Sequence, residues 1–197
     1  MVFARVKSAD LLIGVVALVA ILVALLPSEL KALLVYQRED FRWYQLLTSN
    51  IVHESTSHLL LNLIALVLIG MVARRLMSGL QFSLIFVVGL VSAVLAEHAL
   101  GQPPFMSITI AETRGLSGAL HGLFAGSMLF LAVVSDRIAL LVLFALVVKV
   151  SAEALLGKPF VSSGTVELVA VMGHFGGTIA GLTVATVFVR GRGPRAS

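Results

Sequence analysis

Six long apolar runs separated by short polar segments constrain the fold of this chain more than any other feature. The runs cover residues 9–26, 57–73, 80–98, 116–134, 138–156 and 168–189. Each is close to the roughly 20 residues that an α-helix needs to cross the hydrocarbon core of a bilayer. Their side chains do not alternate between apolar and polar, as the strands of a membrane β-barrel do. We therefore predict an all-α membrane protein, built as a bundle of six transmembrane helices.

The composition agrees with lipid as the main solvent. Hydrophobic residues make up 59% of the 197 residues and charged residues only 12%, whereas a soluble domain carries roughly 25%. No Pro-rich or Ser-rich linker and no convincing repeat divides the chain, so residues 1–197 are predicted to form a single domain. The first run lacks a small-residue cleavage site and is interpreted as a retained helix. The absence of cysteine excludes disulfides and thiolate catalysis.

The basic residues predict the orientation in the membrane. An even number of spans places both termini on one side, together with Arg5, Lys7, Arg74, Arg75, Arg137, Arg190, Arg192 and Arg195. The opposite side holds only Lys31, Arg38, Arg42, Arg114 and Lys158. Both termini are therefore predicted to lie in the cytoplasm. Because the basic residues are dispersed at span ends, the net charge of +4 does not indicate a nucleic-acid partner.

Two polar residues inside the spans form a candidate catalytic pair. Ser117 opens the fourth run within Gly115-Leu116-Ser117-Gly118, and His174 lies near the outer end of the sixth. A serine at a helix start exposes its hydroxyl, and the neighbouring backbone N–H groups can face an oxyanion. A serine activated by a histidine is the smallest nucleophile–base unit. The alternatives are a serine at a small-residue helix contact and a histidine bonded to a nearby carbonyl.

Glycines at four-residue spacing support that pairing. The two sets are Gly118, Gly122 and Gly126 in the fourth run and Gly173, Gly177 and Gly181 in the sixth. Such spacing places each set along one helix face, which allows two helix backbones to approach closely. Two such faces would hold Ser117 near His174.

The second run supplies further polar groups. His58 and Asn62 are four residues apart and so lie on one helix face near its outer end. Both can donate hydrogen bonds, as an oxyanion hole requires. A structural hydrogen bond between helices is the alternative for either residue.

Taken in order, these motifs resemble the rhomboid intramembrane serine proteases over essentially the whole chain. They are His58-x-x-x-Asn62, Gly115-x-Ser117-Gly118 and His174-x-x-Gly177-x-x-x-Gly181. The upstream segment Trp43-Tyr44-Gln45-Leu46-Leu47-Thr48 resembles their first-loop motif, which usually has arginine where this chain has Gln45. His53, five residues before His58, also fits the family pattern.

The resemblance implies a mechanism and a location. Ser117 would attack the scissile carbonyl, with His174 as general base and then general acid and no third carboxylate. His58, Asn62 and the Ser117 N–H would hold the oxyanion, and His53, Gly115 and Gly118 would support or line the site. Water would enter from the periplasmic face of a bacterial inner membrane. Substrates would be transmembrane segments that fray near that face, and neither a cofactor nor a metal ion is implied.

Two departures point to a branch of the family. Rhomboids often place tyrosine where this chain has His121, which could pack on His174, orient it or compete as base. Lys149 and Glu153, four apart in the fifth run, could form an intrahelical ion pair. Leu120-His121-Gly122-Leu123 together with Lys149-x-x-x-Glu153 resembles the rhombosortases. That branch is associated with processing C-terminal Gly-Gly sorting anchors on secreted bacterial proteins, and Glu153 would be a candidate for recognising the anchor.

Other classes fit less well. A zinc-protease motif needs histidines four apart, whereas His53 and His58 are five apart. Intramembrane aspartyl chemistry is disfavoured because Asp10, Asp40 and Asp136 are interpreted as lying outside the spans. A non-catalytic rhomboid-like protein that binds transmembrane helices is the main alternative. A transporter is disfavoured by the small number of charges at mid-membrane.

Overall fold

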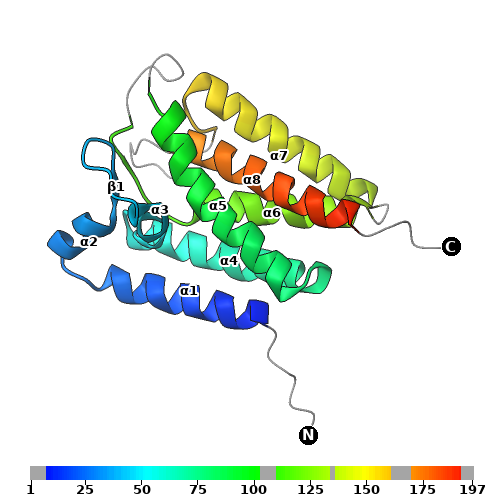
Figure 1. The fold of residues 1–197 in the computed structure, drawn as a ribbon, viewed down its shortest axis with the longest axis horizontal. Coiled ribbons are helices and arrows are strands. Elements are labelled where there is room, and N and C mark those ends of the chain that lie inside the picture. Colours follow the sequence, from blue (N-terminus) through cyan, green and yellow to red (C-terminus); the bar gives the residue numbers. More distant parts are fainter. Residues whose placement is uncertain (1–7, 103–109, 134–135, 161–169, 192–197) are drawn as a thin grey trace, which may run out of the picture.

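The computed structural model describes residues 8–102, 110–133, 136–160 and 170–191 (Figure 1). Within these residues the elements are α1 (Ser8–Ala24), α2 (Ser28–Leu34), β1 (Tyr36–Gln37), α3 (Gln45–Thr48), the 3-10 helix η1 (Ser49–Ile51), α4 (Thr56–Leu76), α5 (Gly79–Leu100), β2 (Glu112–Thr113), α6 (Ser117–Val133), α7 (Arg137–Leu156) and α8 (Val171–Arg190). The chain is thus mostly helical, as predicted. Each of the six apolar runs contains one long helix whose ends lie within a few residues of the predicted ones. Positions 134, 168 and 169 of the predicted spans, and Arg5, Lys7, Arg192 and Arg195, lie outside the described residues.

Four of the long helices, α4, α5, α7 and α8, are long and apolar enough to cross a bilayer. The other two, α1 and α6, are apolar but span only 17 described residues each. Their length is below the roughly 20 residues typical of a spanning helix. The described helices therefore support several membrane crossings, and the count of six stays a prediction.

Side chains at the helix ends explain where several helices begin and end. The Ser55 hydroxyl accepts from the His58 N–H at the start of α4. Ser78 and Gln81 form a reciprocal capping box at the start of α5, and Asp136 accepts two N–H groups of the first turn of α7. These caps satisfy N–H groups that have no partner within their own helix. The left-handed Gly157, with φ 64°, ends α7.

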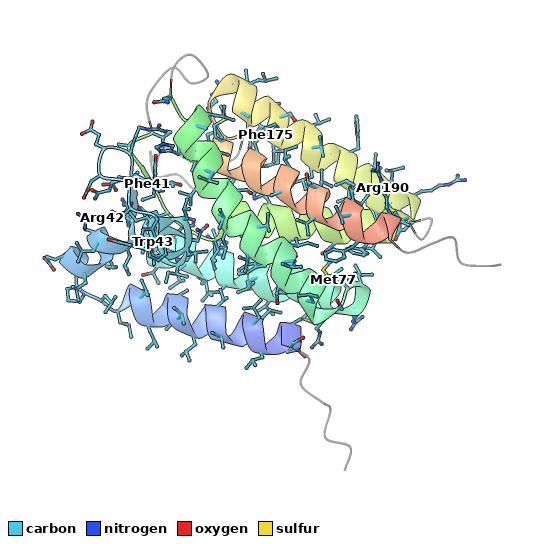
Figure 2. All side chains as sticks on the ribbon, in the orientation of Figure 1. Phe41, Arg42, Trp43, Met77, Phe175 and Arg190 are labelled. Atoms are coloured by element: carbon cyan, nitrogen blue, oxygen red, sulfur yellow. The ribbon has the colours of Figure 1, made fainter. Side chains whose placement is uncertain are left out.

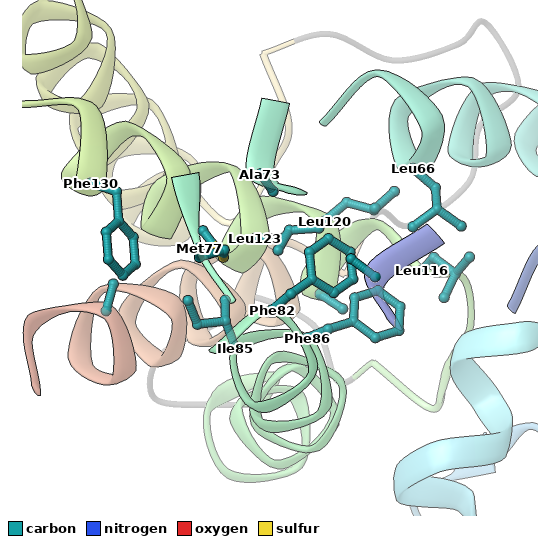
Figure 3. Packing of buried hydrophobic residues seen from close by; sticks show 13 residues of the cluster. Leu66, Ala73, Met77, Phe82, Ile85, Phe86, Leu116, Leu120, Leu123 and Phe130 are labelled. Atoms are coloured by element: carbon teal, nitrogen blue, oxygen red, sulfur yellow. The ribbon is translucent and has the colours of Figure 1, made fainter. Parts of the chain in front are cut away.

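The helix α6 lies at the centre of the bundle, in contact with α4, α5, α7 and α8. Figure 1 shows α1 on one side of the bundle, beside α4, and α7 on the other. The first core cluster joins α4, α5 and α6, with Phe82, Ile85 and Phe86 of α5 against leucines of α4 and α6 (Figure 3). Large apolar side chains on the outer faces of α1, α4 and α7 stay exposed. That distribution is typical of a bundle whose outer surface contacts lipid.

The two ends of the bundle are built from different elements. One end holds the turn between α4 and α5 at Met77 and the end of α8 at Arg190 (Figure 2). The other end holds α2, α3 and the loop with Phe41, Arg42 and Trp43. The Trp43 side chain is 77% exposed, which is typical of an aromatic residue at a membrane interface.

Two features of the structure differ from the sequence-based expectations. Asp10, interpreted above as lying outside the spans, lies in the first turn of α1, the helix of the first apolar run, and its carboxylate binds Arg74 of α4 at 2.7 Å. A short antiparallel sheet pairs Tyr36 with Thr113 and Gln37 with Glu112. This sheet was not predicted, because two-residue strands leave no periodic pattern in the sequence.

Candidate active site

The contact between α6 and α8 is made by backbone atoms. A Cβ atom added to Gly177 would collide with the Gly118 carbonyl group, and one added to Gly181 would collide with that of Gly122. At the outer end of this contact, a Cβ on Gly118 would lie 3.0 Å from the carbonyl oxygen of Gly173. Only glycine allows two helices to approach this closely. We call these five glycines the glycine seam.

Ser117 and His174 lie together at the outer end of the glycine seam. Ser117 is the first residue of α6 and His174 the fourth residue of α8. The His174 Nε2 atom is 2.9 Å from Ser117 Oγ, within hydrogen-bond distance. The Nδ1 atom of His174 is buried and has no hydrogen-bond partner among the described residues. In the tautomer with a free Nε2 lone pair, the serine hydroxyl donates to the imidazole.

His121 lies against the same pair. Its ring stacks on the His174 ring, with centroids 4.2 Å apart and an interplanar angle of 16°. Its Nδ1 is 2.8 Å from the Ser117 carbonyl oxygen, to which it can only donate. The structure shows no hydrogen bond between His121 and the Ser117 hydroxyl within the described residues. Of the roles considered for His121, packing on and orienting His174 agree best with this geometry.

Gly115 brings His58 of α4 up to the turn that precedes Ser117. Its φ is 100°, a left-handed conformation that favours glycine. A Cβ at Gly115 would lie 2.7 Å from His58 Cε1 and 2.9 Å from His58 Nε2. Glycine is therefore required at position 115 for two reasons: the backbone has a positive φ, and a side chain would collide with His58. Asn62 is buried one turn further along α4, where its amide donates to the His58 carbonyl oxygen at 2.8 Å.

His53 precedes α4 and supports His58. The two rings meet edge to face with centroids 5.1 Å apart. The His53 Nδ1 atom lies 3.2 Å from the carbonyl oxygen of Ile51. Burial, together with the neighbouring His58, lowers the pKa of His53 to about 4. His53 is therefore neutral at physiological pH and contacts His58 as an uncharged ring.

A small cavity lies beside Ser117 and His174. Its walls come from α5, from η1 and from the segment that precedes α6, and include Asn50, Ala93 and Arg114. His58 and Asn62 do not line it. The cavity thus lies beside Ser117, while His58 of α4 lies against Gly115 in the turn that precedes Ser117.

Lys149 and Glu153 form the ion pair expected from their spacing, with Nζ and Oε2 2.7 Å apart. Glu153 is 1% exposed, and its second oxygen accepts from the Phe160 N–H at 2.9 Å. Both carboxylate oxygens therefore have partners. The described part of the chain shows no hydrogen bond from this pair to Ser117 or His174, so Lys149 and Glu153 bond each other and not the candidate catalytic residues.

Two polar residues near the site were missed by the sequence reasoning. Glu97 of α5 is fully buried, and its carboxylate accepts from the N–H of Gly173, next to His174. Arg38 donates to the carbonyl oxygens of Glu97, His98, Gly101 and Ile110 around the end of α5. The position of Glu97 within the apolar run 80–98 could have identified it from the sequence, because carboxylates inside spans are functional candidates. Gln45, at the usual arginine position, is buried and accepts from the Arg42 N–H.

Within the described residues, no group of three or more His, Cys, Asp or Glu side chains could hold a metal ion. His53 also precedes α4, so His53 and His58 do not lie on one helix. The described residues thus offer no zinc-protease arrangement.

Residues 40–191 match the family model of the Rhomboid domain. The chain belongs to the rhomboid family. Rhomboids are generally intramembrane serine proteases, so this rhomboid is a multi-pass membrane protein of a protease-type family. No curated protein matched the chain.

Proposed function

We propose that this rhomboid is a serine endopeptidase that cleaves transmembrane segments near the periplasmic face of a bacterial inner membrane. The observation that carries the proposal is the 2.9 Å contact between Ser117 Oγ and His174 Nε2 at a glycine-lined helix contact. A hydroxyl bonded to an unprotonated imidazole nitrogen is the arrangement that nucleophilic catalysis by serine requires. On this proposal six helices cross the membrane, and both termini are cytoplasmic.

The proposed chemistry has two halves. As Ser117 Oγ bonds to the scissile carbonyl carbon, its proton moves to His174 Nε2. The C–N bond then breaks, and His174 returns the proton to the leaving amine. Water attacks the remaining ester in the same way, with His174 again taking and returning a proton.

The oxyanion of each tetrahedral intermediate would form at the start of α6. The N–H groups of the first turn of a helix lack partners within the helix and carry its positive dipole end. Ser117, Gly118 and Ala119 supply these groups here. His58 lies at the adjoining turn and would add a side-chain donor, with Asn62 behind it on α4. Removal of one such donor typically costs about 10²-fold or more in rate.

The test is reaction of the purified protein in detergent with a fluorophosphonate, which labels activated serines. We expect labelling of the wild type and none of Ser117→Ala or His174→Ala. Ser127→Ala is the matched control, because Ser127 is on the same helix but is buried and donates to the Leu123 carbonyl. Labelling that survives Ser117→Ala would refute the nucleophile assignment. A folded wild type that is never labelled, yet binds a transmembrane helix, would favour the non-catalytic alternative.

As to substrate, we propose the rhombosortase role, the removal of C-terminal anchors made of a Gly-Gly motif, a hydrophobic helix and a basic tail. The His121 position and the Lys149–Glu153 pair support it through their resemblance to that branch. Glu153 is the candidate for contact with the anchor, and each of its carboxylate oxygens, bonded to Lys149 or to the Phe160 N–H, can accept one further hydrogen bond.

Co-expression with a secreted protein that carries such an anchor tests the substrate. We expect the anchor to be lost with the wild type and kept with Ser117→Ala. Replacement of Gly-Gly by Ala-Ala in the anchor is the matched control and should block processing. If wild type labels with fluorophosphonate but leaves the anchor intact, the protease proposal stands and the rhombosortase proposal fails.

A further inference from the structure

The start of α8 receives a carboxylate from a neighbouring helix. Glu97 lies in the last turn of α5 and is 0% exposed. Its Oε2 atom accepts from the Gly173 N–H at 2.9 Å. Gly173 is the third residue of α8, and the residue before that helix, Ala170, provides no side-chain cap. Glu97 therefore satisfies an N–H group that the local sequence of α8 leaves unpaired.

This hydrogen bond holds the backbone next to His174. Gly173 directly precedes His174 in the chain. The carbonyl group of Gly173 lies against Gly118, the neighbour of Ser117, at the glycine seam. On its other side Gly173 faces α5, where an added Cβ would lie 3.4 Å from the carbonyl oxygen of Ala93 and 3.7 Å from Glu97 Oε2. Gly173 is thus clamped between α5 and α6.

The position of the His174 imidazole is set mainly by the backbone of α8. Its Nδ1 atom has no hydrogen-bond partner among the described residues, so no hydrogen bond at that nitrogen fixes the orientation of the ring. The stack on His121 restrains the plane of the ring but leaves it free to slide. The position of Nε2 relative to Ser117 Oγ therefore follows the placement of the first turn of α8.

The end of α5 is itself held rigidly, so Glu97 is a fixed point. Arg38 donates to the carbonyl oxygens of Glu97 and His98 at 2.6 Å each. Arg38 also bonds the carbonyl oxygens of Gly101 and Ile110, and its own N–H donates to the Ala111 carbonyl oxygen. The guanidinium therefore bonds carbonyl groups in the last turn of α5 and in the segment that follows it.

We propose that Glu97 is a positioning residue, which sets the distance between His174 and Ser117 by capping the start of α8. The inference rests on the proposed function, because a positioning role has meaning only if that pair reacts. It assigns Glu97 no contact with the substrate. The hydrogen bond to Gly173 needs an acceptor oxygen and not a negative charge, so a glutamine can replace the glutamate.

Fluorophosphonate labelling of Glu97→Ala and Glu97→Gln tests the role. Saturation kinetics separate the maximal labelling rate constant from the probe concentration that gives half of it. In Glu97→Ala we expect the maximal rate constant to fall about tenfold or more, because small displacements of reacting groups are costly. The half-saturating concentration should stay unchanged, since Glu97 does not touch the probe. In Glu97→Gln, whose amide oxygen still accepts from Gly173, the rate should stay within about threefold of wild type.

Met77→Ala controls for lost stability. Met77 is 7% exposed and packs in the core cluster at the opposite end of the bundle. If it lowers the melting temperature as much as Glu97→Ala does but labels like wild type, the slower labelling of Glu97→Ala is not a stability effect. Wild-type labelling of Glu97→Ala would overturn the inference, as would equally slow labelling of Glu97→Gln or of Met77→Ala. Labelling that survives Ser117→Ala would instead overturn the proposed function.

Discussion

The central helix α6 meets its neighbours α8 and α7 through two different kinds of contact. Toward α8 the glycine seam brings backbone against backbone, with carbonyl groups where side chains would otherwise lie. Toward α7 the contact consists of side chains, among them Met128 on α6 and Leu143, Leu146 and Val150 on α7. Side chains can repack when one is changed, whereas a backbone contact can change only if a helix moves.

The difference assigns different tasks to the two contacts. The glycine seam fixes how closely the helices that carry Ser117 and His174 approach, because no side chain lies between their backbones there. The helix α7 carries Lys149 and Glu153 at a contact that has more freedom. We infer that the α6–α8 contact tolerates little change in sequence, and that the α6–α7 contact tolerates more.

Gly177→Ala should break the α6–α8 contact and give the largest effect. The new Cβ would collide with the carbonyl group of Gly118, and only a shift of one helix can relieve the collision. Overpacking of this kind costs about 1–3 kcal/mol of stability. A displacement near 1 Å at a reacting pair costs about 10²-fold in rate. We expect fluorophosphonate labelling to slow by about that factor.

Gly14→Ala is the control for this change. It adds the same methyl group to an apolar helix, but no atom lies within 4 Å of the new Cβ. Its labelling rate should equal that of wild type, and alanine should favour the helix slightly. If Gly177→Ala and Gly14→Ala label equally fast, the glycine seam does not set the reacting distance.

Substitutions at His121 test how much the stack of its ring on His174 contributes to the α6–α8 contact. His121→Phe keeps a ring that can stack on His174, while His121→Ala removes it. Stacked pairs are worth about 0.5–1.5 kcal/mol, so His121→Ala should slow labelling by up to about tenfold. His121→Phe should stay within about threefold of wild type. If His121→Phe is as inactive as His174→Ala, then His121 serves as a base and not as a packing partner.

Leu143→Ala should lower stability with little effect on labelling, because it acts on the α6–α7 contact. Leu143 is 8% exposed and packs in the second core cluster. Its truncation should cost about 2 kcal/mol or more of stability, measured by thermal unfolding in detergent. Labelling at a temperature where the protein is folded should stay within about threefold of wild type. A loss of labelling as large as that of Gly177→Ala would remove the distinction between the two contacts.

The sequence predicted the parts of this architecture that follow from local patterns. Apolar runs located the six long helices, because burial in lipid requires a continuous apolar length. Glycines at four-residue spacing predicted that the fourth and sixth helices would approach each other, and α6 and α8 do. The approach of Ser117 to His174 agrees with this contact, and their catalytic roles stay predictions.

Contacts between residues distant in the chain were beyond that reasoning. The sequence shows a glutamate at position 97 in an apolar run, but not that its partner is the N–H of Gly173, 76 residues further on. The bonds from Arg38 to carbonyl groups at the end of α5 likewise leave no local pattern. The error at Asp10 has a similar origin, since its partner Arg74 is 64 residues away. An ion pair of this kind makes a carboxylate acceptable in an apolar helix.

The smallest effect on labelling should come from His53, whose ring contacts that of His58. The pKa of His53 is about 4 in the folded protein, below its ordinary value of 6.5. Between these two values the unfolded chain binds more protons than the folded one, so stability falls as the pH drops from about 6.5 to 4. The slope of stability against pH from this one group is at most about 1.4 kcal/mol per pH unit.

His53→Gln removes this titrating group. Thermal unfolding in detergent at several pH values should therefore show a shallower loss of stability below pH 6.5 than in wild type, with little difference at pH 8. The other histidines are present in both proteins, so the difference between the two curves isolates His53. Labelling at pH 8 should change less than in any of the α6–α8 variants, because His53 touches neither Ser117 nor His174 but acts through His58. If the stability of His53→Gln and that of wild type change with pH in parallel, His53 is not buried as a neutral ring. Its proposed support of His58 would then be wrong.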